Sequence, residues 1–106
     1  MQILATETLK QLPATILPRL LAIFASTTPE LLGEIHQAAA KHDLHSMAQA
    51  AHKLKGSCVS LGAEQMADLC KTIQDKGEAN DAVDIHAYIA DLNKLYPATL
   101  AAMQSL

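Results

Sequence analysis

The sequence predicts an all-α protein: an antiparallel four-helix bundle with up-down-up-down topology and a short extra helical segment at its N-terminus. Hydrophobic residues make up 50% of the 106 residues and aromatic residues only 3%, so the core must be aliphatic. Alanine and leucine, both strong helix formers, dominate, and no stretch shows the alternating pattern of a half-buried strand. A chain of this length is expected to form one domain over residues 1–106, with a single hydrophobic core.

Two helical stretches are predicted before the central helix. A leading helical segment is expected over about 6–26, interrupted near Pro13. The first bundle helix is expected over about 29–41, because Thr28 can cap a helix whose first position is Pro29.

The central helix is predicted over about 43–61, with Asp43 as its N-cap. Its apolar positions recur at intervals of three and four residues, as in the inward stripe of a bundle helix. They are Leu44, Met47, Ala51, Leu54, Cys58 and Leu61. His52 is rotated by about 100° from Ala51 around the helix, so it lies off this stripe and is expected to face solvent.

Two further bundle helices are predicted over about 63–76 and 82–104. Gly62 is expected to end the central helix as a C-cap, and a loop is expected from Gly77 through the polar residues that follow it. Pro97 is expected to kink the last helix or to break it locally.

Composition and charge exclude several classes of function. The net charge of −3 and the isoelectric point near 5.9 argue against a nucleic-acid-binding surface. No apolar run is long enough to cross a bilayer, and the N-terminus lacks the pattern of a signal peptide, so a cytoplasmic location without direct membrane contact is expected. The chain is also expected to be a monomer. Cys58 and Cys70 fall on apolar stripes and are expected to be buried thiols rather than a disulfide.

The central helix carries a histidine with a lysine and a glycine one helical turn further on. Residues three and four apart are neighbours on a helix surface, so Lys55 and Gly56 should lie beside His52. A glycine within a helix costs roughly 1 kcal/mol relative to alanine, which suggests that something approaches the helix closely there. A free imidazole has a pKa near 6.5, so it is mostly neutral at pH 7 and can act as a covalent nucleophile.

The chain lacks the sequence features that a self-sufficient kinase or ATPase would need. It contains four glycines, none of them in a phosphate-binding loop, and no set of carboxylates suited to magnesium. If His52 carries a phosphoryl group, another protein must supply it. Lys55 would then offset the added negative charge, whereas Lys53, Lys71 and Lys76 would either add positive potential or simply be solvated.

The run from His52 to Ala63, HKLKGSCVSLGA, resembles the signature of histidine-containing phosphotransfer (HPt) domains. The resemblance implies a module of a multistep phosphorelay in which His52 takes a phosphoryl group from the aspartate of a receiver domain and passes it to another receiver. It implies that Lys55 stabilises the charge, that Gly56 admits the receiver, and that Gln74 hydrogen-bonds the histidine ring. Partners would be response-regulator receiver domains or a hybrid histidine kinase, with the chain itself acting as a carrier without kinase activity.

The same resemblance implies further features of cofactor, location and docking. No cofactor is expected in this chain, and magnesium is expected in the partner receiver. The location would be the cytoplasmic side of the inner membrane if the chain is a module of a membrane-bound sensor kinase. Docking is expected on the exposed face of the central helix, which carries His45, Ala48, Gln49, Lys53 and Val59.

Two other interpretations of the same sequence compete with phosphotransfer. His42 and His45 lie one turn apart and could suggest a metal site, but bundle metal sites usually take several inward ligands from facing helices, and no repeated Glu-x-x-His pair occurs. A non-catalytic helical-bundle adaptor is the stronger alternative, because bundle periodicity alone would produce most of this sequence. An adaptor derived from this family would usually lack the histidine, which is present here.

Overall fold

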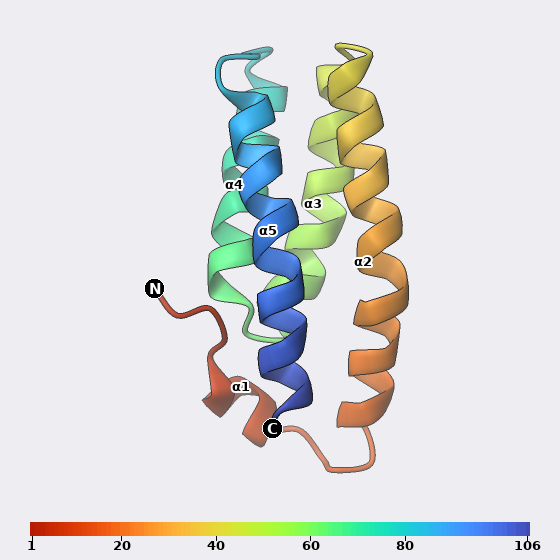
Figure 1. Ribbon diagram of the computed structural model, residues 1–106, viewed down its shortest axis with the longest axis vertical. Helices are drawn as coiled ribbons and strands as arrows, with labels where there is room; N and C mark the ends of the chain where they lie inside the picture. Colours follow the sequence, from red (N-terminus) through yellow and green to blue (C-terminus); the bar gives the residue numbers. More distant parts are fainter.

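The computed structural model describes residues 1–106 and contains five helices and no strand. The helices are α1 (Thr6–Lys10), α2 (Leu17–Ala40), α3 (Leu44–Ser60), α4 (Glu64–Glu78) and α5 (Ile85–Gln104). Helices α2 to α5 run alternately up and down and pack into a four-helix bundle. The C-terminus lies at the lower end of the bundle, and the N-terminus lies beside its lower half (Figure 1). This arrangement confirms the predicted fold class. None of the five helices combines the length and the apolar character that crossing a membrane requires.

Helix α2 is longer than the sequence predicts, because it continues through Pro29 without a break. The predicted helix start at Thr28 and Pro29 is therefore wrong. Pro29 has no N–H, so the carbonyl of Ala25, four residues earlier, loses its helical partner. The phenol of Tyr96 on α5 donates to this carbonyl at 3.3 Å, which replaces the missing bond and lets the helix continue. A phenol is protonated at neutral pH and can donate, and burial raises the pKa of Tyr96 further above its ordinary value of 10.0.

The N-terminal residues cover the lower end of the bundle. The predicted leading segment of 6–26 is divided: only Thr6–Lys10 is a separate helix, and the chain from Leu17 belongs to α2. The N–H of Ala5 donates to the carbonyl of Gly62 at 2.7 Å, and Leu4 and Leu9 are buried in the same core as the bundle helices. Gly62 has φ of +75° at the end of α3, as a C-cap glycine requires.

The last two helices differ from their predicted bounds at one end each. Helix α4 continues to Glu78 and includes Gly77, which is buried rather than part of a loop. Helix α5 begins at Ile85, after Asp84 in the left-handed conformation, and it runs through Pro97 without a break.

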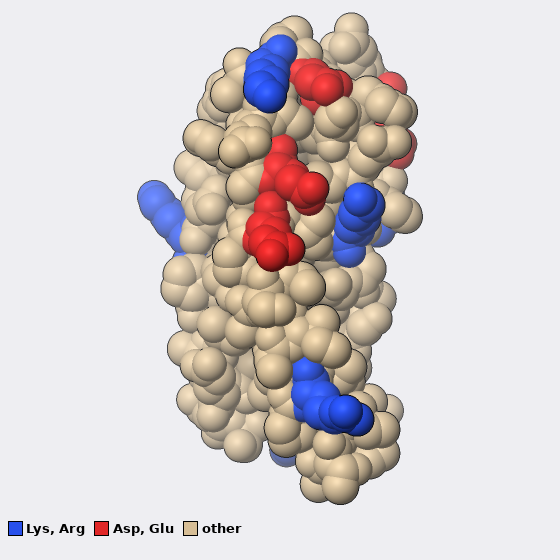
Figure 2. Space-filling model, turned by 90° about the vertical axis from the view of Figure 1, so that its right-hand side faces the viewer, with Lys and Arg blue, Asp and Glu red and all other residues tan.

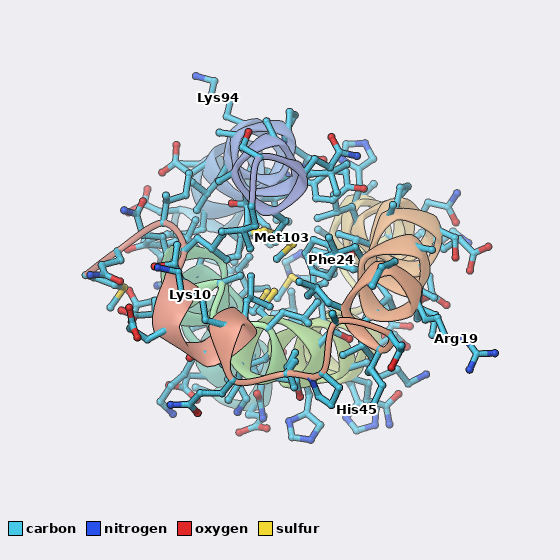
Figure 3. All side chains as sticks on the ribbon, turned by 90° about the horizontal axis from the view of Figure 1, so that it is seen from below. Lys10, Arg19, Phe24, His45, Lys94 and Met103 are labelled. Atoms are coloured by element: carbon cyan, nitrogen blue, oxygen red, sulfur yellow. The ribbon has the colours of Figure 1, made fainter.

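The core is mainly aliphatic, as the composition predicts, and it also contains the side chains of Met47, Met66, Met103, Cys58 and Cys70. On the α2 face, acidic side chains gather over the upper half, and the lower half carries few charges (Figure 2). Seen from below, Phe24 and Met103 point into the centre of the bundle, whereas Arg19, His45 and Lys94 point outward (Figure 3). Phe24 also contacts the ring of Tyr96, with the ring centroids 5.9 Å apart.

Candidate functional site

Helix α3 is held in a defined rotation by its N-cap and its buried face. The carboxylate of Asp43 accepts hydrogen bonds from the hydroxyl of Ser46 at 2.7 Å and from its backbone N–H at 3.1 Å. These bonds, the one from the hydroxyl first, lower the pKa of Asp43. Ala51 and Leu54 are fully buried on the core side. His52 lies between them in sequence and is exposed, in the orientation that the helical periodicity predicts.

The ring of His52 forms one hydrogen bond to another helix, with Gln74 on α4. Its Nδ1 lies 3.3 Å from the side-chain oxygen Oε1 of Gln74. The amide nitrogen Nε2 of Gln74 in turn donates to the carboxylate of Glu78 at 2.9 Å. No protein group bonds Nε2 of His52. The three side chains form a hydrogen-bonded chain across the surface of the α3–α4 pair.

These three side chains lie in an open groove between α3 and α4. The residues lining it are His45, Ala48, Gln49, His52, Lys53, Gln74 and Glu78. All of them except Ala48 are polar or charged, so the groove suits a charged group rather than an apolar ligand. A second, similarly open hollow lies between α4 and α5, away from His52.

Close packing between Ala48 and Gly77 brings α4 to the groove. A Cβ atom added at Gly77 would lie only 2.7 Å from the Cβ of Ala48 and 2.6 Å from the carbonyl oxygen of Leu44, so only glycine fits there. Ala48 is consequently buried, with 4% of its surface exposed. Its predicted place on the exposed docking surface is wrong, because α4 covers it and leaves it at the floor of the groove.

The outer face of α3 is open for one turn on either side of His52. Gly56 is exposed, and a Cβ atom added to it would have no neighbour within 4 Å. Val59 is 63% exposed, and His45 and Gln49 are exposed on the same face. The absence of a side chain at Gly56 therefore leaves the surface beside His52 open to a partner.

The lysines differ in how freely they can serve the groove. Lys53 lines it and forms no ion pair, and Lys55 is half-buried and also unpaired. Lys71 pairs with Asp75 at 3.4 Å. Lys76 pairs at 3.2 Å with an aspartate of the following loop and lies over the Tyr88 ring, so its charge is directed away from His52.

The two cysteines lie in the core beneath the site. Cys58 and Cys70 are free thiols and both are buried, as the sequence predicts. A hydrogen bond with Cys58 and burial raise the pKa of Cys70, so this thiol is inert as a nucleophile. No three histidine, cysteine, aspartate or glutamate side chains gather closely enough to hold a metal ion.

Sequence reasoning missed two members of the site. Glu78 follows Gln74 by four residues, a spacing that places two side chains side by side on a helix, and this spacing could have identified the pair. Gly77 was assigned to a loop, and only the packing of α4 on α3 shows its role.

Both the sequence and the fold resemble known proteins. The Hpt domain family model matches residues 19–105. The chain is 30% identical over 79 residues to phosphotransferase RcsD of Escherichia coli (strain K12), an alignment that covers 74% of this chain and 9% of RcsD. Its fold matches the crystal structure of histidine-containing phosphotransfer protein B (HptB) from Pseudomonas aeruginosa PAO1 with a TM-score of 0.92, covering 97% of this chain and 92% of that one. Sequence identity to HptB is 22%, so this likeness shows the fold alone.

Proposed function

The chain belongs to the Hpt domain family, and we propose that it carries a phosphoryl group on His52 between receiver domains of a multistep phosphorelay. The observation that supports this most directly is the state of the imidazole ring. One ring nitrogen of the exposed His52 is bonded to Gln74, and the other has no partner in the protein. Beside it, Gly56 leaves the approach to the ring open.

The proposed reaction is a direct exchange of the phosphoryl group between two side chains. The lone pair on Nε2 of His52 attacks the phosphorus of a phosphorylated aspartate on the receiver. The N–P bond forms as the P–O bond to the aspartate breaks, and the aspartate leaves as a carboxylate. Transfer to the next receiver aspartate is the reverse of this reaction, so the carrier ends as it began.

Gln74 suits both the free and the phosphorylated ring. With its proton on Nδ1, the phosphorylated ring carries a positive charge, and the oxygen of Gln74 accepts a hydrogen bond from that N–H. When the phosphoryl group is transferred to the next receiver, the leaving group is the neutral imidazole of His52. No proton has to enter or leave the site in either direction.

The receiver is proposed to supply the magnesium ion and this chain a positive surface. Lys53 lines the groove and Lys55 lies one turn beyond His52, both without an ion pair. Their charges would offset the negative charge that the phosphoryl group brings. The chain would act as a carrier and not as a kinase. Because it spans 9% of RcsD, what the whole of RcsD does is not assigned to it.

The test is phosphotransfer from a phosphorylated receiver domain to the chain, to His52→Ala and to His45→Ala. His45 is a matched control for the site of modification only, because it is exposed and lines the same groove. As a residue of the expected docking face it can change the rate of transfer, but it does not decide which histidine is modified. We expect an acid-labile, base-stable modification of the wild type and of His45→Ala, and none of His52→Ala. Label retained in His52→Ala would refute the assignment of the site. A wild-type chain that several receivers bind but none phosphorylates would favour a non-catalytic adaptor.

A further inference from the structure

Glu78 occupies a position that the rules of helix stability disfavour. It is the last residue of α4, where the helix dipole makes a negative charge least favourable. The lysines of α4 do not compensate for it, since Lys71 and Lys76 both pair with other carboxylates. Its only side-chain hydrogen bond is the one of 2.9 Å that it accepts from Gln74. The residue therefore needs an explanation other than helix stability.

The carboxylate of Glu78 determines which way the amide of Gln74 points. The oxygen and nitrogen ends of an amide have nearly the same shape, so the hydrogen-bond partners decide its orientation. An ionised carboxylate can only accept hydrogen bonds, so the NH₂ group of Gln74 must face Glu78. The oxygen of Gln74 must then face His52.

The orientation of Gln74 in turn determines which nitrogen of His52 carries the proton. An amide oxygen only accepts, so Nδ1 of His52 must be the donor across the 3.3 Å contact. In a neutral ring the other nitrogen, Nε2, then holds the lone pair. The neutral ring of free histidine favours the opposite form, with its proton on Nε2. The contact to Gln74 thus reverses the intrinsic preference.

We infer that Glu78 is a positioning residue that orients Gln74 and thereby keeps the proton of His52 on Nδ1, leaving Nε2 as the nucleophile. The role of Nε2 rests on the proposed function, whereas the position of the proton does not. Packing of Gly77 against Ala48 holds this end of α4 on α3, which keeps Glu78 and Gln74 on the side of His52.

A purely electrostatic effect of Glu78 and the positioning role predict opposite changes in the rate of phosphoryl transfer for Glu78→Lys. A lysine would bring positive charge towards the phosphoryl group, so a purely electrostatic site should transfer at least as fast. In the positioning role, however, a lysine can only donate hydrogen bonds, so it turns the oxygen of Gln74 away from His52. The NH₂ group would then face Nδ1, and the proton would move to Nε2, where it blocks the lone pair.

The first measurement is the position of the proton, from the ¹⁵N chemical shifts of the His52 ring at a pH where the ring is neutral. We expect the wild type to carry it mainly on Nδ1 and Glu78→Lys to carry it mainly on Nε2. Glu78→Gln, which can still accept from Gln74, should lie between the two. An Nδ1 proton retained in Glu78→Lys would overturn the inference.

Two controls show whether Glu78 acts through Gln74. Asp68→Lys makes the same change of charge on an exposed residue of α4 that lines the opposite groove with α5, and it should leave the ring unchanged. In a Gln74→Leu background, Glu78→Lys should no longer alter the position of the proton. If it alters the proton as much as before, the effect is one of charge alone and the positioning role is refuted.

The second measurement is the rate of transfer from a phosphorylated receiver, with melting curves recorded to show that each variant is folded. Glu78→Lys should be about tenfold slower than the wild type, the order of factor that one hydrogen bond represents. A rate equal to or above that of the wild type would overturn the inference. If the wild type itself accepts no phosphoryl group, the proposed function fails, and the ring proton still decides the role of Glu78.

Discussion

Gly56 offers the sharpest separation of stability from transfer, because the structure supplies a matched control. Neither Gly56 on α3 nor Gly33 on α2 would place an added Cβ within 4 Å of another atom. Alanine at either position should therefore stabilise the protein, by about 0.4–1 kcal/mol through the unfolded state. For a domain of this size the gain corresponds to a rise in Tm of about 2–8 °C.

A longer side chain should affect transfer at Gly56 but not at Gly33. The phosphorus of the donor must come within about 3–3.5 Å of the ring nitrogen, and a displacement of 1 Å can cost about a hundredfold in rate. Gly56→Gln should thus lower the transfer rate by about this factor and leave the melting temperature at or above that of the wild type. Gly33→Gln, which faces the groove between α2 and α5, should melt similarly and transfer normally.

The assay compares single-turnover transfer from a phosphorylated receiver with thermal melts of the same four variants. Wild-type transfer by Gly56→Gln would refute the view that the receiver approaches across this turn of α3. An equal loss of transfer in Gly33→Gln would show that bulk on any helix disturbs the bundle. The first outcome would place the docking face elsewhere on the bundle, and the second would mean that the loss in Gly56→Gln comes from a disturbed fold.

Three further predictions concern the core and the charge near the site. Thr28→Val removes a buried hydroxyl that has no hydrogen-bond partner, so thermal unfolding should show a gain of about 1 kcal/mol; a loss would mean that the hydroxyl is bonded. Lys55→Ala should leave the fold intact and slow transfer only in part, because a surface charge is worth about 0–1 kcal/mol; transfer kinetics like those of the wild type would show that this lysine is merely solvated. Since the pKa of Cys70 is raised, its contribution to stability is complete below the ordinary value of 9.0 and is lost as the pH rises above it, where the unfolded thiol ionises first. The free energy of unfolding, measured in urea, should therefore fall more steeply above that pH for the wild type than for Cys70→Ala. Parallel pH profiles of the two proteins would contradict the raised pKa.

The fold class could be predicted from the sequence because it depends on local patterns, whereas the path of α2 could not. Apolar residues three and four apart are sufficient to define amphipathic helices and their inward faces. Pro29 was interpreted by the local rule that a proline begins a helix. The rule fails here because Tyr96, 71 residues after Ala25, donates to the carbonyl that the proline leaves free. No pattern around residue 29 contains that information.

The site likewise has features that could be predicted from local sequence patterns and features that could not. The rotation of α3 and the exposure of His52 follow from the spacing of apolar residues, and the structure places Gln74 beside the ring as the family resemblance implies. Ala48 shares the face of His52 in a helical projection, but α4 covers it because Gly77 allows a close approach. How near two helices come depends on residues of both, so the burial of Ala48 could not be derived from α3 alone.

The attachment of the N-terminal residues also has a consequence for how the molecule opens. They are bonded to the start of α4 across long separations, for instance by the side chain of Gln65 to the carbonyl of Met1, 64 residues apart. Closing so long a loop costs conformational entropy, and the contacts that offset this cost exist only after the turn between α3 and α4 has formed. This segment should therefore dock last and detach first. Such a segment forms its own unit of local unfolding, with an opening free energy below that of the bundle. In native-state hydrogen exchange, the amide of Ala5 should therefore exchange well before the buried amides of α3, at a rate set by detachment of the segment alone.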